Sequence, residues 1–280
     1  MSELPGDMTP TTTPTIGGLY AETFAPPGTP KGVVVITHGY ADHCGRYREV
    51  AHVCVKAGWA AVSYDCRGHG KSPGDRGAID RFDSYLTDLS AIIAGARKLV
   101  ADGAPLVLLG HSHGSLITLR ALCGDHPPAN IAGAIVSSPY LGLKMAVPGW
   151  QKVLARVASR LAPKLKQPNH IKASQLTHDP KKIAEHDADK LVFGTATPRW
   201  FTESTDAQDY VAAHADRITV PTTWLVGADD PLADPAVSRA VANKVKGATY
   251  HDLVGMLHEV FNETDRASVF AKLTAALPTA

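Results

Sequence analysis

A serine flanked by glycines is the strongest chemical signal in this chain. The segment Gly110-His111-Ser112-His113-Gly114 follows an apolar run and opens a stretch with helical spacing. A sharp turn from strand to helix strains the serine backbone and needs small residues on both sides. The dipole of the following helix then points at the hydroxyl. We therefore predict that Ser112 is a nucleophile for acyl transfer.

A second segment, Gly70-Lys71-Ser72-Pro73-Gly74, fits the same five-residue pattern. It follows the loop Arg67–Gly70 instead of a strand, and Pro73-Gly74 predicts a turn where a helix would have to begin. We expect no nucleophilic role for Ser72. A phosphate-binding loop would need a glycine at the position of Asp65, so a nucleotide site is not supported either.

A serine hydroxyl needs an imidazole to take its proton and a carboxylate to orient that imidazole. One known chain order of such triads is serine, acid, histidine. The turn after the apolar run that ends at Val226 offers two acids, and we favour Asp230 with Asp229 as the alternative. His258 follows the last predicted strand, and we expect it to be the base and to open the final helix.

The negative charge that develops on a substrate oxygen needs backbone donors on two sides. We predict that the amides of His113 and Tyr40 supply them, because Tyr40 lies just after the first strong strand in Thr37-His38-Gly39-Tyr40-Ala41. The alternative for this loop is a plain turn that ends a strand.

Several other residues are expected to line the substrate pocket. His111 and His113 flank the nucleophile too closely to act as its base, so we interpret them as pocket residues. Neither begins a metal-binding motif, and the cysteine and histidine spacings do not suggest zinc. We predict no metal and no organic cofactor. The predicted substrate contacts are His38, Gly39, His111 and Tyr140.

Short apolar runs alternate with helix-patterned segments from Lys31 onward, which predicts a mostly parallel sheet flanked by helices, as in the α/β-hydrolase fold. The predicted strands are Val33–Thr37, Ala60–Tyr64, Pro105–Gly110, Ile131–Val136, Thr222–Val226 and Thr249–Leu253. The predicted helices are Tyr47–Ala57, Arg81–Ala101, Ser115–Gly124, Pro235–Val245 and His258–Ala276.

The alternation breaks at residues 140–205, which we interpret as a helical cap inserted after the sixth strand of a core formed by residues 16–139 and 206–280. One cap segment is amphipathic, and it either packs on its own domain or forms a lid whose apolar face guides a greasy substrate. Its apolar residues are Trp150, Val153, Leu154, Val157 and Leu161, opposite Lys152, Arg156 and Arg160.

The composition, with 44% apolar residues in 280, fits one soluble core with an insertion. A formal charge of +1 argues against a nucleic-acid partner. No apolar run reaches the roughly 18 residues that span a bilayer, so we expect at most peripheral membrane contact through the cap. Residues 1–15 have no basic start and no apolar stretch, and we expect a flexible tail.

The cysteines indicate the compartment. The chain has four cysteines and no C-x-x-C pair, and each lies in or beside an apolar run. We interpret them as free thiols in a reducing compartment, the cytoplasm.

Longer motifs around these residues resemble the monoacylglycerol lipase and lysophospholipase group of the α/β-hydrolase superfamily. The resemblance covers residues 31–273, through HGYADHCGRY from His38, DCRGHGKSPG from Asp65 and HEVFNE from His258. It implies a triad of Ser112, Asp230 and His258, with an oxyanion hole at Tyr40 and His113. Tyr40, Ala41 and His113 depart from the smaller residues and the methionine common in this group, which we expect to narrow the pocket.

Together these features predict a serine hydrolase that cleaves a small-molecule ester through an acyl-enzyme. The resemblance implies a glycerol-linked or lysophospholipid monoester of a fatty acid as the substrate. Two alternatives remain: a peptidase, lactonase or perhydrolase that uses the same triad, and a binding protein that retains the fold without turnover.

Overall fold

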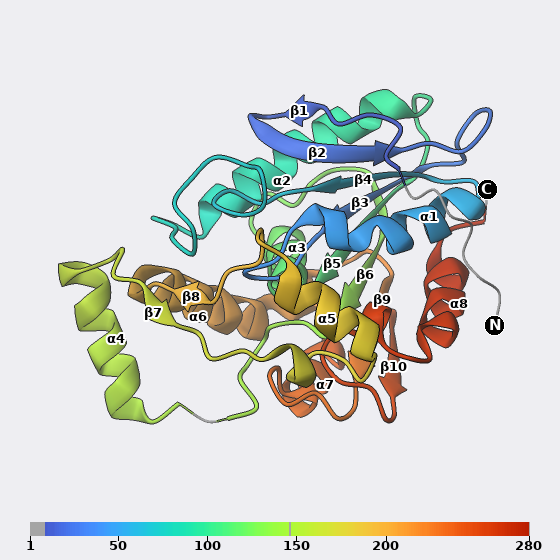
Figure 1. Ribbon diagram of the computed structural model, residues 1–280. Helices are drawn as coiled ribbons and strands as arrows, with labels where there is room; N and C mark the ends of the chain where they lie inside the picture. Colours follow the sequence, from blue (N-terminus) through green and yellow to red (C-terminus); the bar gives the residue numbers. More distant parts are fainter. Residues whose placement is uncertain (1–8, 146, 280) are drawn as a thin grey trace.

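An eight-stranded sheet forms the centre of the computed structural model, which describes residues 9–145 and 147–279 (Figure 1). Its strands lie in the order β1-β2-β4-β3-β5-β6-β9-β10. Their bounds are β1 (Thr15–Ile16), β2 (Leu19–Phe24), β3 (Val33–Thr37), β4 (Ala60–Tyr64), β5 (Leu106–His111), β6 (Ile131–Ser137), β9 (Thr222–Gly227) and β10 (Ala248–Leu253).

The pairing is parallel from β4 through β10, and β1 and β2 add an antiparallel edge. This confirms the predicted fold class and the six predicted strands. Strands β1 and β2 were not predicted from the sequence. The run LYAETF of β2 carries Glu22, a residue type that strands disfavour. In the structure Glu22 is buried against Arg48, which forms two hydrogen bonds to it at 2.8 and 2.6 Å.

Alternate residues of the central strands enter two separate cores, one on each face of the sheet. In β3, Val33 and Val35 join one core, whereas Val34 and Ile36 join the other. The helices α2 (Asp83–Ala96), α3 (His113–Leu122) and α7 (Pro235–Ala242) cover the first face. The helices α1 (Arg48–Lys56) and α8 (Arg266–Ala276) cover the second. Both faces are therefore apolar, as parallel sheets require.

The expectation that His258 opens the last helix is wrong, because α8 begins at Arg266. Residues between β10 and α8 form a loop that side chains and the cap hold in place. The carboxylate of Glu263 accepts a hydrogen bond from the amide of Leu257 at 2.9 Å. The amide of Glu259 donates to the carbonyl of Leu176 at 2.7 Å. These contacts hold the segment around His258 as a loop ahead of α8.

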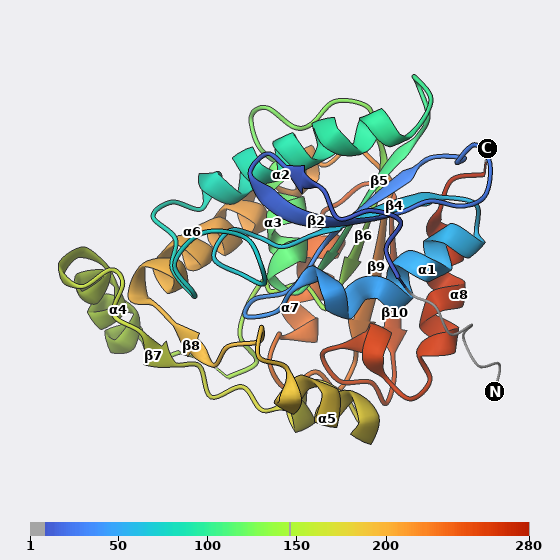
Figure 2. The same ribbon diagram turned by 45° about the horizontal axis from the view of Figure 1, so that its top comes forward.

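The segment between β6 and β9 contains α4 (Gly149–Leu161), β7 (Gln167–Pro168), α5 (Pro180–Ala188), β8 (Thr195–Ala196) and α6 (Pro198–His214). Helix α4 lies at the edge of the molecule in both views (Figures 1 and 2). It packs on α6 through its polar side, where Ser159 and Thr202 share a hydrogen bond of 2.9 Å. Its apolar residues face outward, with Trp150 66% and Leu161 82% exposed.

Two further expectations concern the chain start and membrane spans. Of the predicted N-terminal tail, residues 1–8 lie outside the described residues. The amides of Thr11 and Thr12 donate to the carbonyl of Thr23 at 2.7 and 3.4 Å, so this part follows the sheet edge. Within the described chain, no helix combines the length and the apolar character needed to cross a bilayer.

Candidate active site

Ser112 occupies the turn between β5 and α3. Its backbone has φ 51° and ψ −114°, a conformation that residues with a side chain rarely adopt. The flanking glycines permit it, since a Cβ on Gly110 would lie 2.5 Å from the carbonyl oxygen of Gly114. A Cβ on Gly114 would lie 2.1 Å from the carbonyl oxygen of Thr37. The strand, turn and helix therefore pack too closely for any other residue at these two positions.

The loop after β3 lies directly against this turn. A Cβ on Gly39 would come within 3.2 Å of the His111 ring and 3.5 Å of Cβ of Ser112. The next residue is Tyr40, so its amide follows the point of closest approach. His113 is the first residue of α3, where helix amides have no partner within the helix. The two predicted oxyanion donors therefore belong to segments that flank Ser112.

His258 and Asp230 form a short hydrogen bond below this turn. The distance from Nδ1 of His258 to Oδ2 of Asp230 is 2.6 Å, and both residues are buried. The other carboxylate oxygen of Asp230 accepts from the amides of Leu232 and Ala233 at 2.8 and 3.0 Å. Gly227 lets the two loops meet, because a Cβ there would lie 2.0 Å from the carbonyl oxygen of Leu257.

The charge of Asp230 changes how His258 titrates. Burial alone would lower the pKa of His258, but the adjacent carboxylate and its hydrogen bond raise that pKa above the usual value. The neighbouring imidazole of His111 behaves differently: burial and the proximity of His258 lower the pKa of His111 to about 4. Of these two rings, His258 is therefore the one suited to accept and hold a proton near neutral pH.

The alternative residues lie in different surroundings. Asp229 is exposed, and its carboxylate accepts from the amide of Gly255 at 3.0 Å. Ser72 is buried, where its hydroxyl donates to the carbonyl of Asp65 at 2.7 Å and accepts from the amide of Tyr20 at 2.9 Å. Neither residue contacts the His258 and Asp230 pair through a hydrogen bond in the described chain.

Ser112 and His258 line one cavity of about 240 Å³. The core also contributes Gly39, Tyr40 and His111, which the sequence analysis had placed at the site. The segment between β6 and β9 lines the other side of the cavity, with apolar and polar residues that lie before α5, at its end and after it. These residues are Asn169, Ile171, Leu176, His186, Asp187, Asp189, Val192, Phe193 and Gly194.

Of the predicted pocket residues that the structure describes, His38, His113 and Tyr140 do not line this cavity. Nε2 of His38 accepts from the amide of Cys66 at 2.9 Å, which turns the ring into the protein. Tyr140 stacks on Trp200 with its ring centre 5.9 Å away. Burial lowers the pKa of His113 to about 3, with a further contribution from His38, so its ring is a neutral packing group.

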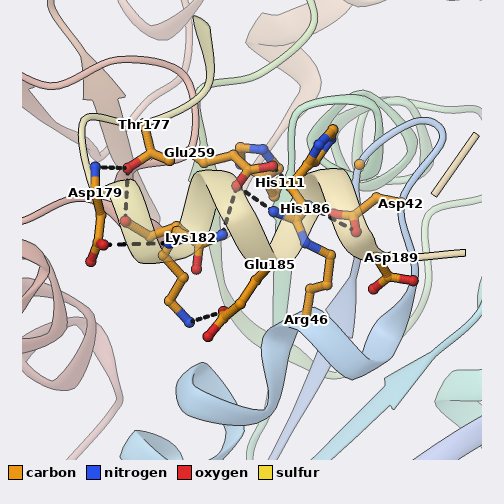
Figure 3. A network of polar contacts seen from close by, with 12 residues as sticks. Asp42, Arg46, His111, Thr177, Asp179, Lys182, Glu185, His186, Asp189 and Glu259 are labelled. Atoms are coloured by element: carbon orange, nitrogen blue, oxygen red, sulfur yellow. Dashed lines mark hydrogen bonds and ion pairs between the residues drawn. The ribbon is translucent and has the colours of Figure 1, made fainter. Parts of the chain in front are cut away.

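A buried ion-pair cluster beside the site was not predicted from the sequence (Figure 3). The guanidinium of Arg46 forms two hydrogen bonds to Glu259 at 2.8 and 2.7 Å, and an ion pair with Asp42 at 3.1 Å. Burial alone would raise the pKa of both carboxyls, but Arg46 holds each below its usual value. The cluster joins the loop that carries Tyr40 to the residue after His258. Asp42 and Arg46 belong to the motif that begins at His38, and Glu259 belongs to the motif that begins at His258, so the sequence did contain the residues of this cluster.

Comparison with known proteins gives the family. The model of the family Hydrolase_4, described as serine aminopeptidase, S33, matches residues 28–265. The chain belongs to this family. Within this hydrolase family, the chain is 31% identical over 271 residues to a monoacylglycerol lipase of Mycolicibacterium smegmatis, covering 93% of each protein. It is 29% identical to the phospholipase YtpA of Bacillus subtilis, with 86% of this chain and 93% of that protein covered.

A solved structure of the same fold is similar over nearly its whole length. The monoacylglycerol lipase of Paleococcus ferrophilus superposes with a TM-score of 0.81 at 28% identity, covering 92% of this chain and 99% of that one. This hydrolase therefore has the α/β-hydrolase fold that the sequence predicted. No group of three His, Cys, Asp or Glu side chains among the described residues is arranged to hold a metal ion.

Proposed function

We propose that this protein, a carboxylic ester hydrolase of its family, cleaves monoesters of fatty acids with glycerol or a glycerophosphate-type alcohol. The single observation that carries the proposal is the buried hydrogen bond of 2.6 Å between His258 and Asp230, in a cavity that His258 and Ser112 both line. The monoacylglycerol lipases and the phospholipase among the similar proteins support the substrate class.

In the proposed reaction, Oγ of Ser112 attacks the ester carbonyl carbon while Nε2 of His258 takes the hydroxyl proton. The amides of Tyr40 and His113 stabilise the resulting oxyanion. His258 then gives the proton to the leaving alcohol, and the C–O bond of the ester breaks to leave an acyl-enzyme. Water repeats the sequence and releases the fatty acid. Asp230 keeps the proton of His258 on Nδ1 and stabilises the imidazolium.

An aminopeptidase reaction is the second candidate, because the family description names that activity. A free α-ammonium group would need an unpaired carboxylate close to the nucleophile. Four carboxylates line the cavity: Asp42, Asp187, Asp189 and Glu259. Arg46 neutralises two of them, and His43 contacts Asp189 at 2.7 Å. The fourth, Asp187, is 67% exposed at the side chain. This pairing favours an alcohol group over an α-ammonium group in the cavity.

The test compares three substrates on the same enzyme: monooctanoylglycerol, octanoyl lysophosphatidylcholine and an alanine p-nitroanilide. We expect kcat/KM for at least one octanoyl ester to exceed that for the anilide by about 100-fold or more, which is a difference of roughly 2.7 kcal/mol in transition-state binding. Ser112→Ala is the control for background hydrolysis. Faster cleavage of the anilide would overturn the ester assignment in favour of a peptidase.

We also propose peripheral membrane contact through α4 and a cytoplasmic location. The outward apolar residues of α4 include Val153 and Leu154, which are 64% and 58% exposed. A lipid-like substrate is held in a membrane or micelle, and the apolar face of α4 can contact such a surface. The cysteines of the described chain are free and buried, consistent with a reducing compartment. Flotation with lipid vesicles tests the contact, and retained binding after Trp150→Ser with Leu154→Ser would exclude α4 as its source.

A further inference from the structure

The side chain of Tyr40 is fixed at one wall of the active-site cavity. Its hydroxyl lies 3.2 Å from the carbonyl oxygen of Gly77 and 3.0 Å from that of Thr195, so its single proton is shared between the core and the cap. The ring stacks on Trp200 of α6 with centres 3.6 Å apart and planes at 27°. A ring held by both its face and its hydroxyl cannot turn aside for a ligand.

The surroundings are shaped to receive this ring. Gly77 has φ +70°, and a Cβ there would lie 2.8 Å from the hydroxyl oxygen of Tyr40. The carbonyl of Gly77 also accepts from the hydroxyl of Thr197, at 2.9 Å, at the start of α6. Burial raises the pKa of the Tyr40 hydroxyl, so it stays protonated and continues to donate. The loop around Gly77 and the cap therefore form one binding site for the Tyr40 side chain.

Other aromatic rings pack around the Tyr40 ring. His69, His113 and Phe193 surround it edge-on, with ring centres 5.5, 6.0 and 5.6 Å away. Both histidines are almost fully buried, at 1% exposure each. Removal of the Tyr40 ring would therefore open a space walled by other aromatic groups and continuous with the cavity.

The two parts of the cavity wall suggest which part of a substrate lies beside Tyr40. Phe193 contacts Tyr40, and with Val192 it makes this part of the wall apolar. The charged cluster of Arg46, Asp42 and Glu259 also lines the cavity, and it suits a polar alcohol. Because the ester carbonyl must lie beside the amide of Tyr40, the first carbons of the acyl chain then lie beside its ring.

The cavity is small for a long fatty acid. A buried cavity of about 150 Å³ holds one benzene molecule, so 240 Å³ corresponds to about ten non-hydrogen atoms. Pockets that enclose drug-sized ligands are larger, at about 300–1,000 Å³. The cavity is partly open to solvent, so a palmitoyl chain would have to extend beyond it, whereas a butyryl or octanoyl chain fits within this volume.

We infer that the ring of Tyr40 is a specificity-determining group that ends the acyl part of the cavity and restricts the enzyme to esters of short and medium acyl chains. The inference rests on the proposed ester hydrolysis and deepens it by naming the acyl class. Tyr40 has two separate roles in this view: its backbone amide serves the reaction, and its side chain limits the length of the substrate.

The test measures kcat/KM for p-nitrophenyl butyrate, octanoate, laurate and palmitate, each below its micelle concentration, on the wild type and on Tyr40→Ala. We expect the wild type to favour butyrate or octanoate over palmitate by about tenfold or more. In Tyr40→Ala the ratio of palmitate to octanoate should rise by about tenfold, the effect of burying roughly two further methylenes. A ratio is used because a uniform loss of rate leaves it unchanged.

Three variants control the test. Tyr40→Phe keeps the ring and should retain the wild-type ratio, which separates ring volume from the hydrogen bonds. Leu99→Ala removes a side chain that is 40% exposed and does not line the cavity, and it should also retain the wild-type ratio. Tyr40→Leu shortens the side chain less drastically and replaces Tyr40→Ala if that variant fails to fold.

The outcomes separate the two proposals. An unchanged ratio in a folded Tyr40→Ala or Tyr40→Leu variant that still cleaves octanoate overturns the inference. So does a wild type that cleaves palmitate as well as octanoate. A wild type that cleaves none of the esters overturns the proposed function, and the inference with it.

Discussion

The two sides of the active-site cavity are built differently. On the core side, backbones meet at distances that leave no room for a Cβ at Gly110, Gly114 or Gly227, and Asp230 and His258 are buried. On the cap side, α5 has no buried residue and α4 exposes its apolar residues. Helices α4 and α5 are therefore packed more loosely than the core loops around Ser112 and His258.

This difference separates two tasks of the enzyme. Groups that transfer protons must keep their distances within a fraction of an ångström, which dense packing achieves. Groups that admit substrates of various shapes tolerate looser packing, and regions with few buried contacts have low local stability. Core substitutions should therefore change the rate of the chemical step, whereas cap substitutions should change which substrates bind.

The largest expected effect is the loss of the candidate nucleophile. Ser112→Ala should lower kcat for octanoyl esters by about 10⁴-fold or more, because the hydroxyl forms the acyl-enzyme. The unfolding midpoint should change little. Ser72→Ala is the matched control on the second glycine-flanked serine: it should retain kcat and lose about 1–3 kcal/mol of stability, because it leaves buried partners unpaired. Activity loss confined to Ser72→Ala would reverse the assignment.

The second largest expected effect on kcat distinguishes the two neighbouring aspartates. Asp230→Asn should lower kcat by about 10⁴-fold, because an amide no longer stabilises the imidazolium or fixes the tautomer of His258. Asp229→Asn should change kcat by less than about fivefold, because that residue is exposed and its carboxylate accepts a hydrogen bond from the Gly255 amide. Steady-state kinetics on one ester measure both. A larger effect at Asp229 would move the acid to that position.

The pH dependence of the same pair has a definite sign. His258 must be neutral to accept a proton, and the adjacent Asp230 raises its pKa. In the wild type, kcat/KM should fall as pH drops through this raised pKa. In Asp230→Asn the residual activity should persist to lower pH, because the charge that held the proton is gone. Movement of the acid limb to higher pH would contradict the assignment.

A third effect compares one ion pair from each side of the cavity. Arg46→Met leaves Asp42 and Glu259 buried without a counter-charge and should cost about 3–5 kcal/mol of unfolding free energy. The cap pair of Arg156 and Asp206 has side chains 58% and 54% exposed, so Arg156→Met should cost less than about 1 kcal/mol. Urea unfolding measures both. Equal losses would show that the two sides are equally constrained.

Acid sensitivity provides a second measure of the Arg46 cluster. Folded Asp42 and Glu259 have lowered pKa values, so their contribution to stability is present above the unfolded pKa and is lost as pH falls through the folded pKa. Unfolding free energy of the wild type should therefore fall on acidification below about pH 5. The fall should be smaller in Arg46→Met.

The sequence predicted the core side well because local rules determine it. Apolar runs predicted β3 to β6, β9 and β10, and the glycines around Ser112 predicted the turn. The start of α8 was wrong because helical spacing does not reveal that Glu263 binds the amide of Leu257. Strand β2, which lies between β1 and β4, was missed because its buried Glu22 needs Arg48, a partner 26 residues away.

The cap side was predictable in outline only. Spacing predicted the amphipathic helix, but not that Ser159 would face α6 while Trp150 faces outward. Tyr40 stands where the resembling group commonly has a smaller residue, and this predicted a narrower pocket. The position of the Tyr40 side chain depends on contacts with Thr195 and Trp200, more than 150 residues further along the chain. Long-range contacts of this kind leave no local pattern in the sequence.

The smallest expected effect concerns backbone strain between Tyr40 and Asp42. Ala41 has φ 61°, a left-handed conformation that costs an alanine roughly 1–2 kcal/mol. Ala41→Gly relieves this strain and adds about 0.5–1 kcal/mol of unfolded-chain entropy, so the net gain in unfolding free energy should be about 0.5–1 kcal/mol. On the cap side, a methyl group added to Gly194 would meet no atom within 4 Å, and the φ of Gly194 is not left-handed.

Gly194→Ala, the opposite substitution, should therefore raise the unfolding free energy by a similar amount, about 0.4–1 kcal/mol. Thermal unfolding of both variants measures the pair. The kinetic effects should differ: Ala41→Gly loosens the loop that carries the Tyr40 amide and should lower kcat a few-fold, whereas Gly194→Ala should leave kcat unchanged. A fall in the melting temperature of Ala41→Gly would show that the strain is offset by contacts of its methyl group, which is buried.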